Sequence, residues 1–282
     1  MATEKIVTLL LDEDRLAIVE TKKKARDIAS AARLVANAFK AGGRTLFVGA
    51  GTSGRLGVLE AAECPPTFGT RPEMILGVMA GGEGAVFRAK EGSEDRADQG
   101  EQAVATVTSK DVVIGISASS VTPFVRAALK KAHARRAKTV LLTCAPQARL
   151  STFADVVIAI RTGPEVLTGS TRLKAGSATK AALNAITTAA MIRSGKAYTN
   201  FMVDLKQTSK KLEDRARRIV AVAAGVDLTE ADRLLSAADD EVKTAIVMGL
   251  LQLDAPTARV KLTAAAGHVR KATNGHRRTI RA

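Results

Sequence analysis

The chain has 282 residues, a formal net charge of +15 and 46% hydrophobic residues, with only 3% aromatic residues and no tryptophan. A chain of this length can bury one large core together with a small additional domain. The shortage of aromatic side chains argues against a stacking surface for single-stranded nucleic acid. Because the basic residues form no dense block, we interpret the charge as a solvated basic surface, with no nucleic acid as partner.

The cysteines and the chain's apolar runs indicate the compartment. Cys64 and Cys144 are far apart in the sequence, as is typical of reduced thiols in a cytosolic protein. The first apolar run is interrupted at once by acidic residues, so it does not resemble a secretory signal. No apolar stretch approaches the roughly 20 residues that a membrane-spanning helix needs. The sequence therefore predicts a cytoplasmic protein without a membrane partner.

The first half of the chain alternates between helical and strand patterns. Apolar residues at three-to-four spacing predict a helix over 4–41, which Gly42-Gly43 ends. Apolar runs without alternation then predict five strands, at 45–48, 74–79, 112–117, 139–144 and 156–160. Helical patterns such as 121–136 separate several of these strands. We therefore expect an α/β fold with a flavodoxin-like, doubly wound, five-stranded parallel sheet.

After Gly163 the pattern becomes helical. The expected helices lie at 173–194, 202–224, 229–237, 240–252 and 255–266. Thr229 is placed to cap the third of these helices, and Pro256 suits the first turn of the last. We expect an N-terminal helical segment at 1–42, an α/β domain at 43–220 and a small helical domain with a basic tail at 221–282.

A glycine-rich turn at 49–54 follows the first strand and has the spacing GxGxxG. A dinucleotide-binding turn of this kind needs an acidic residue at the end of the second strand, to hold the ribose hydroxyls. The second strand instead ends at Met79 and continues as Ala80-Gly81-Gly82, with no acidic residue before Glu83. A dinucleotide site is therefore disfavoured.

Hydroxyl groups suggest a different ligand for this turn. Gly51, Thr52 and Ser53 place two O–H donors and free backbone N–H groups where a helix begins, which suits a phosphate group. A second hydroxyl-rich turn follows the third strand and contains Ser117, Ser119, Ser120 and Thr122. Such residues also cap helices without binding anything. Because two such turns follow parallel strands, we favour a site for a sugar phosphate.

Longer motifs resemble a known family. The run GAGTSGRLGVLEAAECPPTFG at 49–69 resembles the signature of the N-acetylmuramic acid 6-phosphate etherase family, within the sugar isomerase (SIS) domain superfamily. Similar motifs are MAGGE at 79–83, EGSED at 91–95, GPEVLTGSTRLKAG at 163–176 and MIRSGKAYTNFMVD at 191–204. The resemblance extends from about residue 12 to the end. It implies that 43–220 is a SIS domain, that a small helical domain follows, and that the protein is a homodimer.

The resemblance also implies an activity. The family cleaves the D-lactyl ether of N-acetylmuramic acid 6-phosphate by elimination and water addition, and the reaction requires no cofactor. By resemblance, Glu63 protonates the departing ether oxygen and Glu94 is the base that removes the C2 proton. The residues themselves support Glu63, because Cys64 and Pro65 supply an apolar surrounding that would favour a protonated carboxyl group. Glu60, one helical turn earlier, is its competitor.

The sequence by itself gives weaker support to the other site residues that the resemblance implies. Glu94 stands in a run of acidic residues, which is usually a solvated surface. Ser170 precedes a long helix, so substrate contact and helix capping remain equally open, whereas Glu83 and Glu165 fit structural roles better. No group of histidines, cysteines and carboxylates has metal-ligand spacing, so no metal is indicated. The thiol of Cys64, without a histidine nearby in the sequence, suits packing.

Two adjacent positions depart from the family pattern. The second hydroxyl turn usually has Gly-Arg before Thr-Pro, whereas this chain has Ser120-Val121. A glycine's backbone freedom and a cation are both missing, so we expect the affinity or specificity for substrate to differ from the family's.

Three other functions remain to be weighed. A non-catalytic sugar-phosphate sensor resembling glucokinase regulatory protein needs the phosphate site but neither glutamate. A ketose-aldose isomerase of the same superfamily shares the phosphate site but does not predict the motifs ECPPTFG or TGSTRLKAG. The interpretation as a nucleic-acid-binding protein depends on the net charge alone, so we rank it last.

Overall fold

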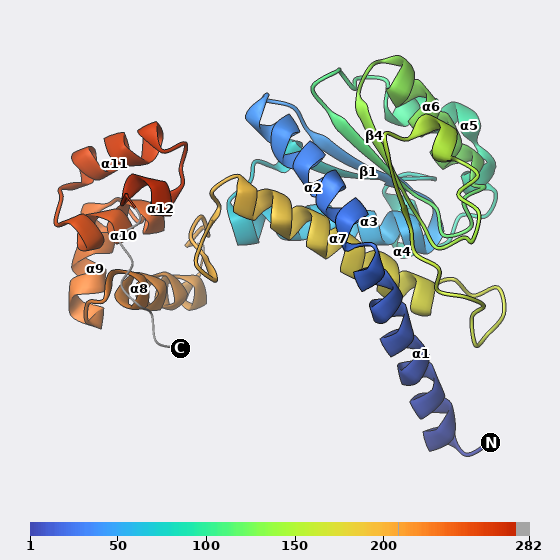
Figure 1. The fold of residues 1–282 in the computed structure, drawn as a ribbon, viewed down its shortest axis with the longest axis horizontal. Coiled ribbons are helices and arrows are strands. Elements are labelled where there is room, and N and C mark those ends of the chain that lie inside the picture. Colours follow the sequence, from blue (N-terminus) through green and yellow to red (C-terminus); the bar gives the residue numbers. More distant parts are fainter. Residues whose placement is uncertain (208, 275–282) are drawn as a thin grey trace. The chain divides into compact units, whose positions relative to one another are not determined.

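The computed structural model describes residues 1–207 and 209–274, which form two compact units (Figure 1). The first unit comprises Met1–Glu63 and Arg71–Ala190, and the second comprises Cys64–Thr70 and Met191–Ala282. The sequence places the start of the helical domain at residue 221. The second unit also contains residues 191–220, because helix α8 (Lys210–Ala224) packs in its hydrophobic core.

Five parallel strands form the sheet of the first unit, in the order β2-β1-β3-β4-β5. Their bounds are β1 (Thr45–Gly49), β2 (Ile75–Met79), β3 (Val112–Ile116), β4 (Lys138–Thr143) and β5 (Val156–Ala159). This is the flavodoxin-like order, so the predicted fold class is confirmed. After β1 the chain continues to β2, toward one edge of the sheet, and after β3 it continues to β4, toward the opposite edge. The carboxyl ends of these two strands therefore flank the point where such folds bind ligands.

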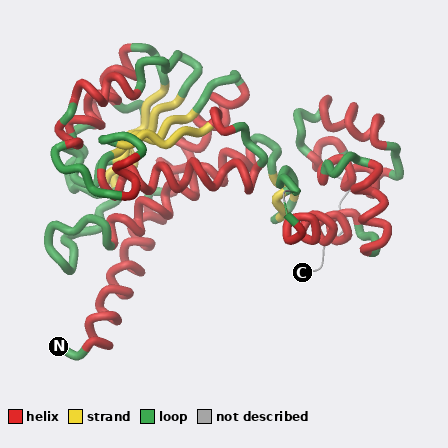
Figure 2. The backbone as a smooth tube through the Cα atoms, turned by 180° about the vertical axis from the view of Figure 1, so that it is seen from behind, coloured by secondary structure: helices red, strands yellow, loops and turns green. Residues whose placement is uncertain are grey.

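Helices cover both faces of this sheet (Figures 1 and 2). Those that begin in the first unit are α1 (Thr3–Lys23), α2 (Ala25–Lys40), α3 (Gly51–Phe68), α4 (Gly84–Phe87), α5 (Ala97–Ala103), α6 (Pro123–Ala134) and α7 (Lys174–Arg193), with short 3₁₀ turns η1 (Pro72–Met74), η2 (Ser93–Asp95) and η3 (Ser151–Phe153). Leu46 and Val48 of β1 pack in one core with Leu129 of α6. Phe47 between them faces the opposite layer, where Gly57 of α3 lies against it. Burial of both faces explains why the strands are continuous apolar runs.

The N-terminal segment is two helices rather than the single helix predicted over 4–41. The helices meet at Lys24, whose backbone (φ −95°, ψ 14°) interrupts the helix. Helix α2 has a buried face that includes Ile28 and Val35, whereas α1 buries only Ala17 and Thr21. The break thus separates a helix that packs in the core from one whose side chains are mostly exposed. Among the described residues, no helix is both long enough and apolar enough to span a membrane.

In the second unit, a hairpin precedes the helix that the sequence predicted from residue 202. Strands β6 (Ala197–Tyr198) and β7 (Phe201–Met202) pair in antiparallel fashion, and the extended chain after them buries Val203 and Leu205. The helix therefore starts only at Lys210. The remaining helices are α9 (Leu228–Ala237), α10 (Val242–Leu251), α11 (Ala255–Ala264) and α12 (Val269–Ala272).

Aspartates cap two helices of this unit, and Thr229 is not the cap of α9. The side chain of Asp227 accepts a hydrogen bond from Glu230 N (2.8 Å) at the start of α9. Asp254 does the same for α11, whose first turn contains Pro256 as predicted. The early part of the predicted basic tail forms the end of α11 and α12, and residues 275–282 lie outside the described residues.

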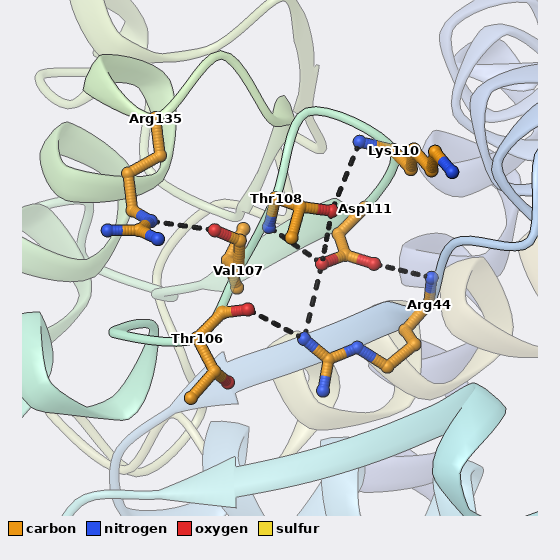
Figure 3. Close-up of polar contacts among 7 residues, drawn as sticks. All are labelled: Arg44, Thr106, Val107, Thr108, Lys110, Asp111 and Arg135. Carbon is orange, nitrogen blue, oxygen red and sulfur yellow. Dashed lines mark hydrogen bonds and ion pairs between the residues drawn. The ribbon is translucent and has the colours of Figure 1, made fainter.

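A buried carboxylate joins the amino ends of β1 and β3 (Figure 3). Asp111, only 2% exposed, accepts hydrogen bonds from the backbone N–H groups of Arg44 (2.7 Å) and Thr108 (2.8 Å) and from the Arg44 guanidinium (3.2 Å). Burial acts to raise the pKa of Asp111, but these hydrogen bonds outweigh it and hold the pKa below its ordinary value. This edge of the sheet is opposite to the carboxyl ends of the strands, so the network serves folding.

Replacing Asp111 with alanine is expected to lower the free energy of unfolding by about 2–3 kcal/mol, because several donors lose a charged acceptor. Since the folded pKa is depressed, the wild-type advantage is complete above about pH 4, where an unfolded aspartate is ionised. It diminishes as the pH falls through the folded pKa. Urea unfolding at several pH values measures both effects. A change below about 0.5 kcal/mol, as for an ordinary surface substitution, contradicts this account.

Candidate active site

The first hydroxyl turn lies at the carboxyl end of β1. The strand ends at Gly49, and α3 begins at Gly51. Gly51 is exposed, and Thr52 and Ser53 are half-buried. The first N–H groups of a helix have no partner within that helix and favour an anion. The turn thus presents backbone donors and two hydroxyls at one place, as a phosphate site requires.

The second hydroxyl turn lies beside it. Gly49 of β1 is paired with Ile116 of β3, so the turns that follow these residues leave the same edge of the sheet. The hydroxyls of Ser117 and Thr122 lie 2.9 Å apart and hold the turn together. Thr122 precedes α6, but its side chain makes no capping hydrogen bond. Helix capping therefore does not account for this hydroxyl. Ser119 is exposed at the same turn.

Ser120 has a different environment from its neighbours. It is fully buried, and its Oγ accepts a hydrogen bond from Leu150 N (3.2 Å), in the segment after β4. Its φ of 58° lies in the left-handed region that favours glycine. This chain therefore keeps at Ser120 the backbone conformation that a glycine would adopt. We expect Ser120 to support the turn rather than to touch a ligand.

The variants Ser120→Gly and Ser120→Ala separate the effect of the Oγ hydrogen bond from that of the left-handed backbone conformation. Both variants lose the hydrogen bond to Leu150 N, but only glycine relieves the left-handed strain, which costs roughly 1–2 kcal/mol. The glycine variant should therefore be the more stable of the two by about 1 kcal/mol. Denaturant unfolding of the pair measures the difference. Equal stabilities contradict a strained Ser120.

A cavity of about 380 Å³ adjoins the start of α3 and contains Glu94. Its lining includes Gly51, the end of β2 at Met79, and Lys90. Lys90 Nζ donates to the carbonyl of Gly81 (2.8 Å), in the turn that follows β2. Glu94 lies in the 3₁₀ turn η2, is exposed to solvent, and lines this cavity. The structure thus brings Glu94 and the first hydroxyl turn together, although Glu94 follows Gly51 by 43 positions in the sequence.

Two cations of this cavity were missed by the sequence analysis. Arg55 donates to the carbonyls of Val86 (2.8 Å) and Ala85 (2.8 Å), and so fixes α4 beside the cavity. Lys90 uses one hydrogen bond in the described contacts and is exposed. A lysine in a charged run carries no signal of a binding role. Where the family usually has an arginine, this chain has the exposed Val121. Lys90 therefore supplies a positive charge on the cavity lining in a chain that lacks that arginine.

The loop before α7 lies near the first hydroxyl turn. A Cβ placed on Gly176 would lie 3.9 Å from Thr52 Cγ2, so the start of α7 and the start of α3 are neighbours. Glu165 caps α7 by accepting hydrogen bonds from Lys174 N (3.2 Å) and Ala175 N (3.0 Å). This is the structural role expected of Glu165. Since a glutamate supplies the cap, capping does not explain the half-buried Ser170.

Glu63 does not line this cavity. It lies on α3 roughly three turns beyond Gly51, about 18 Å along the helix axis. Its side chain is exposed, so the apolar surrounding expected from Cys64-Pro65 is absent within the described chain, while Cys64 itself is buried as expected. The competitor Glu60 is buried and accepts hydrogen bonds from Asn184 (2.7 Å) and Thr187 (2.5 Å) of α7. Glu60 therefore joins α3 to α7.

The fold and the two hydroxyl turns define a SIS-domain protein. The model of the SIS domain matches residues 91–189, and that of the glucokinase regulatory protein N-terminal SIS domain matches residues 27–133. The phosphoheptose isomerase of Francisella tularensis has the same fold, with a TM-score of 0.54 and 18% identity, over 68% of this chain and 98% of that one.

Closer relatives define the family. The N-acetylmuramic acid 6-phosphate etherase of Salinibacter ruber is 48% identical over 279 residues, 97% of this chain and 89% of the relative. The etherase of Geobacillus thermodenitrificans is 48% identical over 274 residues, 96% of this chain and 93% of the relative. The chain belongs to the N-acetylmuramic acid 6-phosphate etherase family. The resemblance seen in the motifs is thereby confirmed.

Proposed function

We propose that this protein is a carbon–oxygen lyase that converts N-acetylmuramic acid 6-phosphate into N-acetylglucosamine 6-phosphate and D-lactate, a step of cell-wall amino-sugar recycling. The observation that carries the proposal is the cavity that places Glu94 next to the start of α3. Near-full-length identity of 48% to etherases supports it. Phosphate binding at Thr52 and Ser53 would orient the sugar with its reacting carbons toward that cavity.

The chemistry proceeds through the open-chain aldehyde, which acidifies the C2 proton. A base removes this proton, a double bond forms between C2 and C3, and the C3–O bond breaks with its electron pair on the ether oxygen. An acid protonates that oxygen, and D-lactate departs. Water then adds its hydroxyl to C3 and a proton to C2. Two carboxyl groups with different protonation states suffice for these transfers.

We assign Glu94 as the base and Glu63 as the acid. The distance of about 18 Å between Gly51 and Glu63 along α3 exceeds the size of one amino sugar. A phosphate at Gly51 and a leaving oxygen at Glu63 of the same chain are therefore incompatible. We infer that the protein is a homodimer in which a second copy of the chain supplies Glu63.

Helix α1 supports a dimer. Val7, Leu11 and Ile18 fall on one side of the helix and are 48%, 64% and 47% exposed. Ile18 also borders an apolar groove of about 410 Å³ between α1, α2 and α7. Exposed apolar side chains of this kind, beside an apolar groove, mark a protein interface. A second copy is the partner that a symmetric oligomer would place there.

Mixing two inactive variants tests the shared site. Dimers that combine a Glu63→Gln chain with a Glu94→Gln chain have one complete site if the two residues come from different copies. After denaturation and refolding together, activity should return to about a quarter of wild type, because half of the dimers are mixed and each has one of two sites intact. No recovery, with mixed dimers detected by differential tags, places both glutamates of a site on one chain.

The activity itself is tested by incubating the folded protein with N-acetylmuramic acid 6-phosphate and measuring D-lactate. Release of D-lactate supports the lyase, whereas binding of the sugar phosphate without release supports the sensor that resembles glucokinase regulatory protein. We further propose that the reaction takes place in the cytoplasm, the compartment indicated by the two separated cysteines.

A further inference from the structure

Lys90 lies along the glycine turn that follows β2. Its Nζ donates to the carbonyl of Gly81 (2.8 Å). A Cβ placed on Gly81 would lie 3.3 Å from Lys90 Cδ, and one placed on Gly84 would lie 3.5 Å from Lys90 Nζ. The motif MAGGE at 79–83, to which Gly81 belongs, therefore holds the ammonium group of Lys90 at the carboxyl end of β2.

Arg55 and Lys90 line the same cavity but differ in the donors that they can offer to a ligand. Arg55 uses its Nε and one Nη to bind the carbonyls of Val86 (2.8 Å) and Ala85 (2.8 Å). Lys90 is exposed and, in the described contacts, uses one of its three N–H groups for Gly81. Two N–H groups of Lys90 therefore remain for a ligand in the cavity.

The proposed substrate brings two anionic groups to this site. Its phosphate is on C6, and its lactyl carboxylate is attached to C3 through one oxygen and one carbon atom. Because C3 is bonded to C2, the base at C2 and the group that binds the carboxylate must lie close to each other. Lys90 and Glu94 line one cavity, together with Gly51 of the first hydroxyl turn.

The carboxylates of this cavity make a cation necessary there. Glu91 and Glu94 both line it, and like charges disfavour the approach of a lactyl carboxylate. A positive charge in the same lining offsets that repulsion. Lys90 supplies the charge and the free N–H groups at one place, since its ammonium group is fixed by the carbonyl of Gly81.

We propose that Lys90 binds the lactyl carboxylate and makes the site specific for a sugar phosphate that carries a carboxylate at C3. The proposal deepens the proposed function and rests on it. The phosphate binds at the first hydroxyl turn, and the ammonium group of Lys90 donates charge-assisted hydrogen bonds to the carboxylate. When the C3–O bond breaks, D-lactate takes this contact with it, so N-acetylglucosamine 6-phosphate keeps only the phosphate contact.

Lys90→Met tests the proposal by comparing two sugar phosphates. The variant should raise KM for N-acetylmuramic acid 6-phosphate by about 5–20-fold, as expected for a charge-assisted contact that is partly exposed. Loss of binding that is equal in the ground state and the transition state leaves kcat within about threefold. The inhibition constant of N-acetylglucosamine 6-phosphate, which has the phosphate but no carboxylate, should stay within about twofold. Lys90→Arg retains the charge and N–H donors, so it should recover most of the affinity.

Lys138→Met is the matched control. Lys138 is also an exposed lysine of the first unit, and its Nζ binds Asp155 (2.8 Å). It begins β4, at the edge of the sheet opposite to the cavity. The substitution removes the same charge from the protein, so KM should stay within about twofold if distant charges are screened.

A change in the ligand tests the same contact. An analogue in which the lactyl carboxylate is converted to the methyl amide should inhibit wild-type protein about 5–20-fold more weakly than the KM of the acid implies. The Lys90→Met variant should bind the acid and the amide about equally, because the two changes remove one interaction.

Each outcome has one meaning. A rise in KM with unchanged inhibition by N-acetylglucosamine 6-phosphate supports carboxylate binding by Lys90. An equal loss of affinity for both sugar phosphates, or no change in KM, overturns this role and leaves the proposed function intact. Wild-type protein that releases no D-lactate overturns the proposed function itself.

Discussion

Glu94→Gln is expected to abolish exchange of the C2 proton of N-acetylmuramic acid 6-phosphate with deuterium oxide and to lower D-lactate release by about 10²–10⁴-fold. Both effects follow from the loss of a general base, whose contribution is of that size. Glutamine has nearly the same shape as glutamate but cannot accept the proton. Glu94 and Gly51 line the same cavity, and the substitution removes no hydrogen-bond donor of the first hydroxyl turn, so binding of the phosphate should be little affected.

Glu91→Gln is the control for this prediction. Glu91 lines the same cavity and is also exposed, so its replacement changes the local charge equally. Exchange and turnover of this variant should stay within about threefold of wild type, since a single exposed charge contributes little. Exchange at the wild-type rate in Glu94→Gln would show that another group is the base.

Glu63→Gln is expected to lower D-lactate release by a similar factor of about 10²–10⁴ and to leave C2 exchange intact. Without a proton donor, the ether oxygen departs slowly, whereas Glu94 still removes and returns the C2 proton. Proton NMR in deuterium oxide follows both events in one sample. Loss of exchange together with release would assign Glu63 to an earlier step.

The variant Glu60→Gln distinguishes the loss of the catalytic acid from the loss of a structural contact on the same helix. The carboxylate of Glu60 accepts hydrogen bonds from Asn184 and Thr187. The amide of a glutamine would place an N–H group toward one of these two donors. The free energy of unfolding should fall by about 1–3 kcal/mol, while turnover of the folded enzyme changes little. The reverse pattern, a stable protein without activity, would make Glu60 rather than Glu63 the acid.

The sheet could be predicted from the sequence because its signals are local. Each strand is a short apolar run, and burial on both faces removes the alternation that would otherwise complicate the pattern. The two hydroxyl turns could also be placed, since turns that follow parallel strands meet at one edge. Gly49 and Ile116 are indeed register partners.

Features that depend on distant contacts were not predictable. The helix predicted from residue 202 starts only at Lys210, because a hairpin at Ala197–Met202 and a segment that buries Val203 and Leu205 come before it. The left-handed conformation of Ser120 occurs together with a hydrogen bond from Leu150 N to its Oγ, and Leu150 is distant in the sequence. The placement of Lys90 at the cavity likewise has no local signal. The distance between Glu63 and Gly51 becomes apparent only when α3 is a single helix.

Oxygen-18 labelling tests the central claim most directly. The protein is incubated with N-acetylmuramic acid 6-phosphate in water enriched in oxygen-18, and both products are analysed by mass spectrometry. Elimination followed by water addition predicts D-lactate without label and N-acetylglucosamine 6-phosphate with a labelled oxygen at C3, which fragmentation distinguishes from label that exchanges into the C1 oxygen through the open-chain aldehyde. Label in the lactate, or no lactate at all, would contradict cleavage of the C3–O bond by this enzyme.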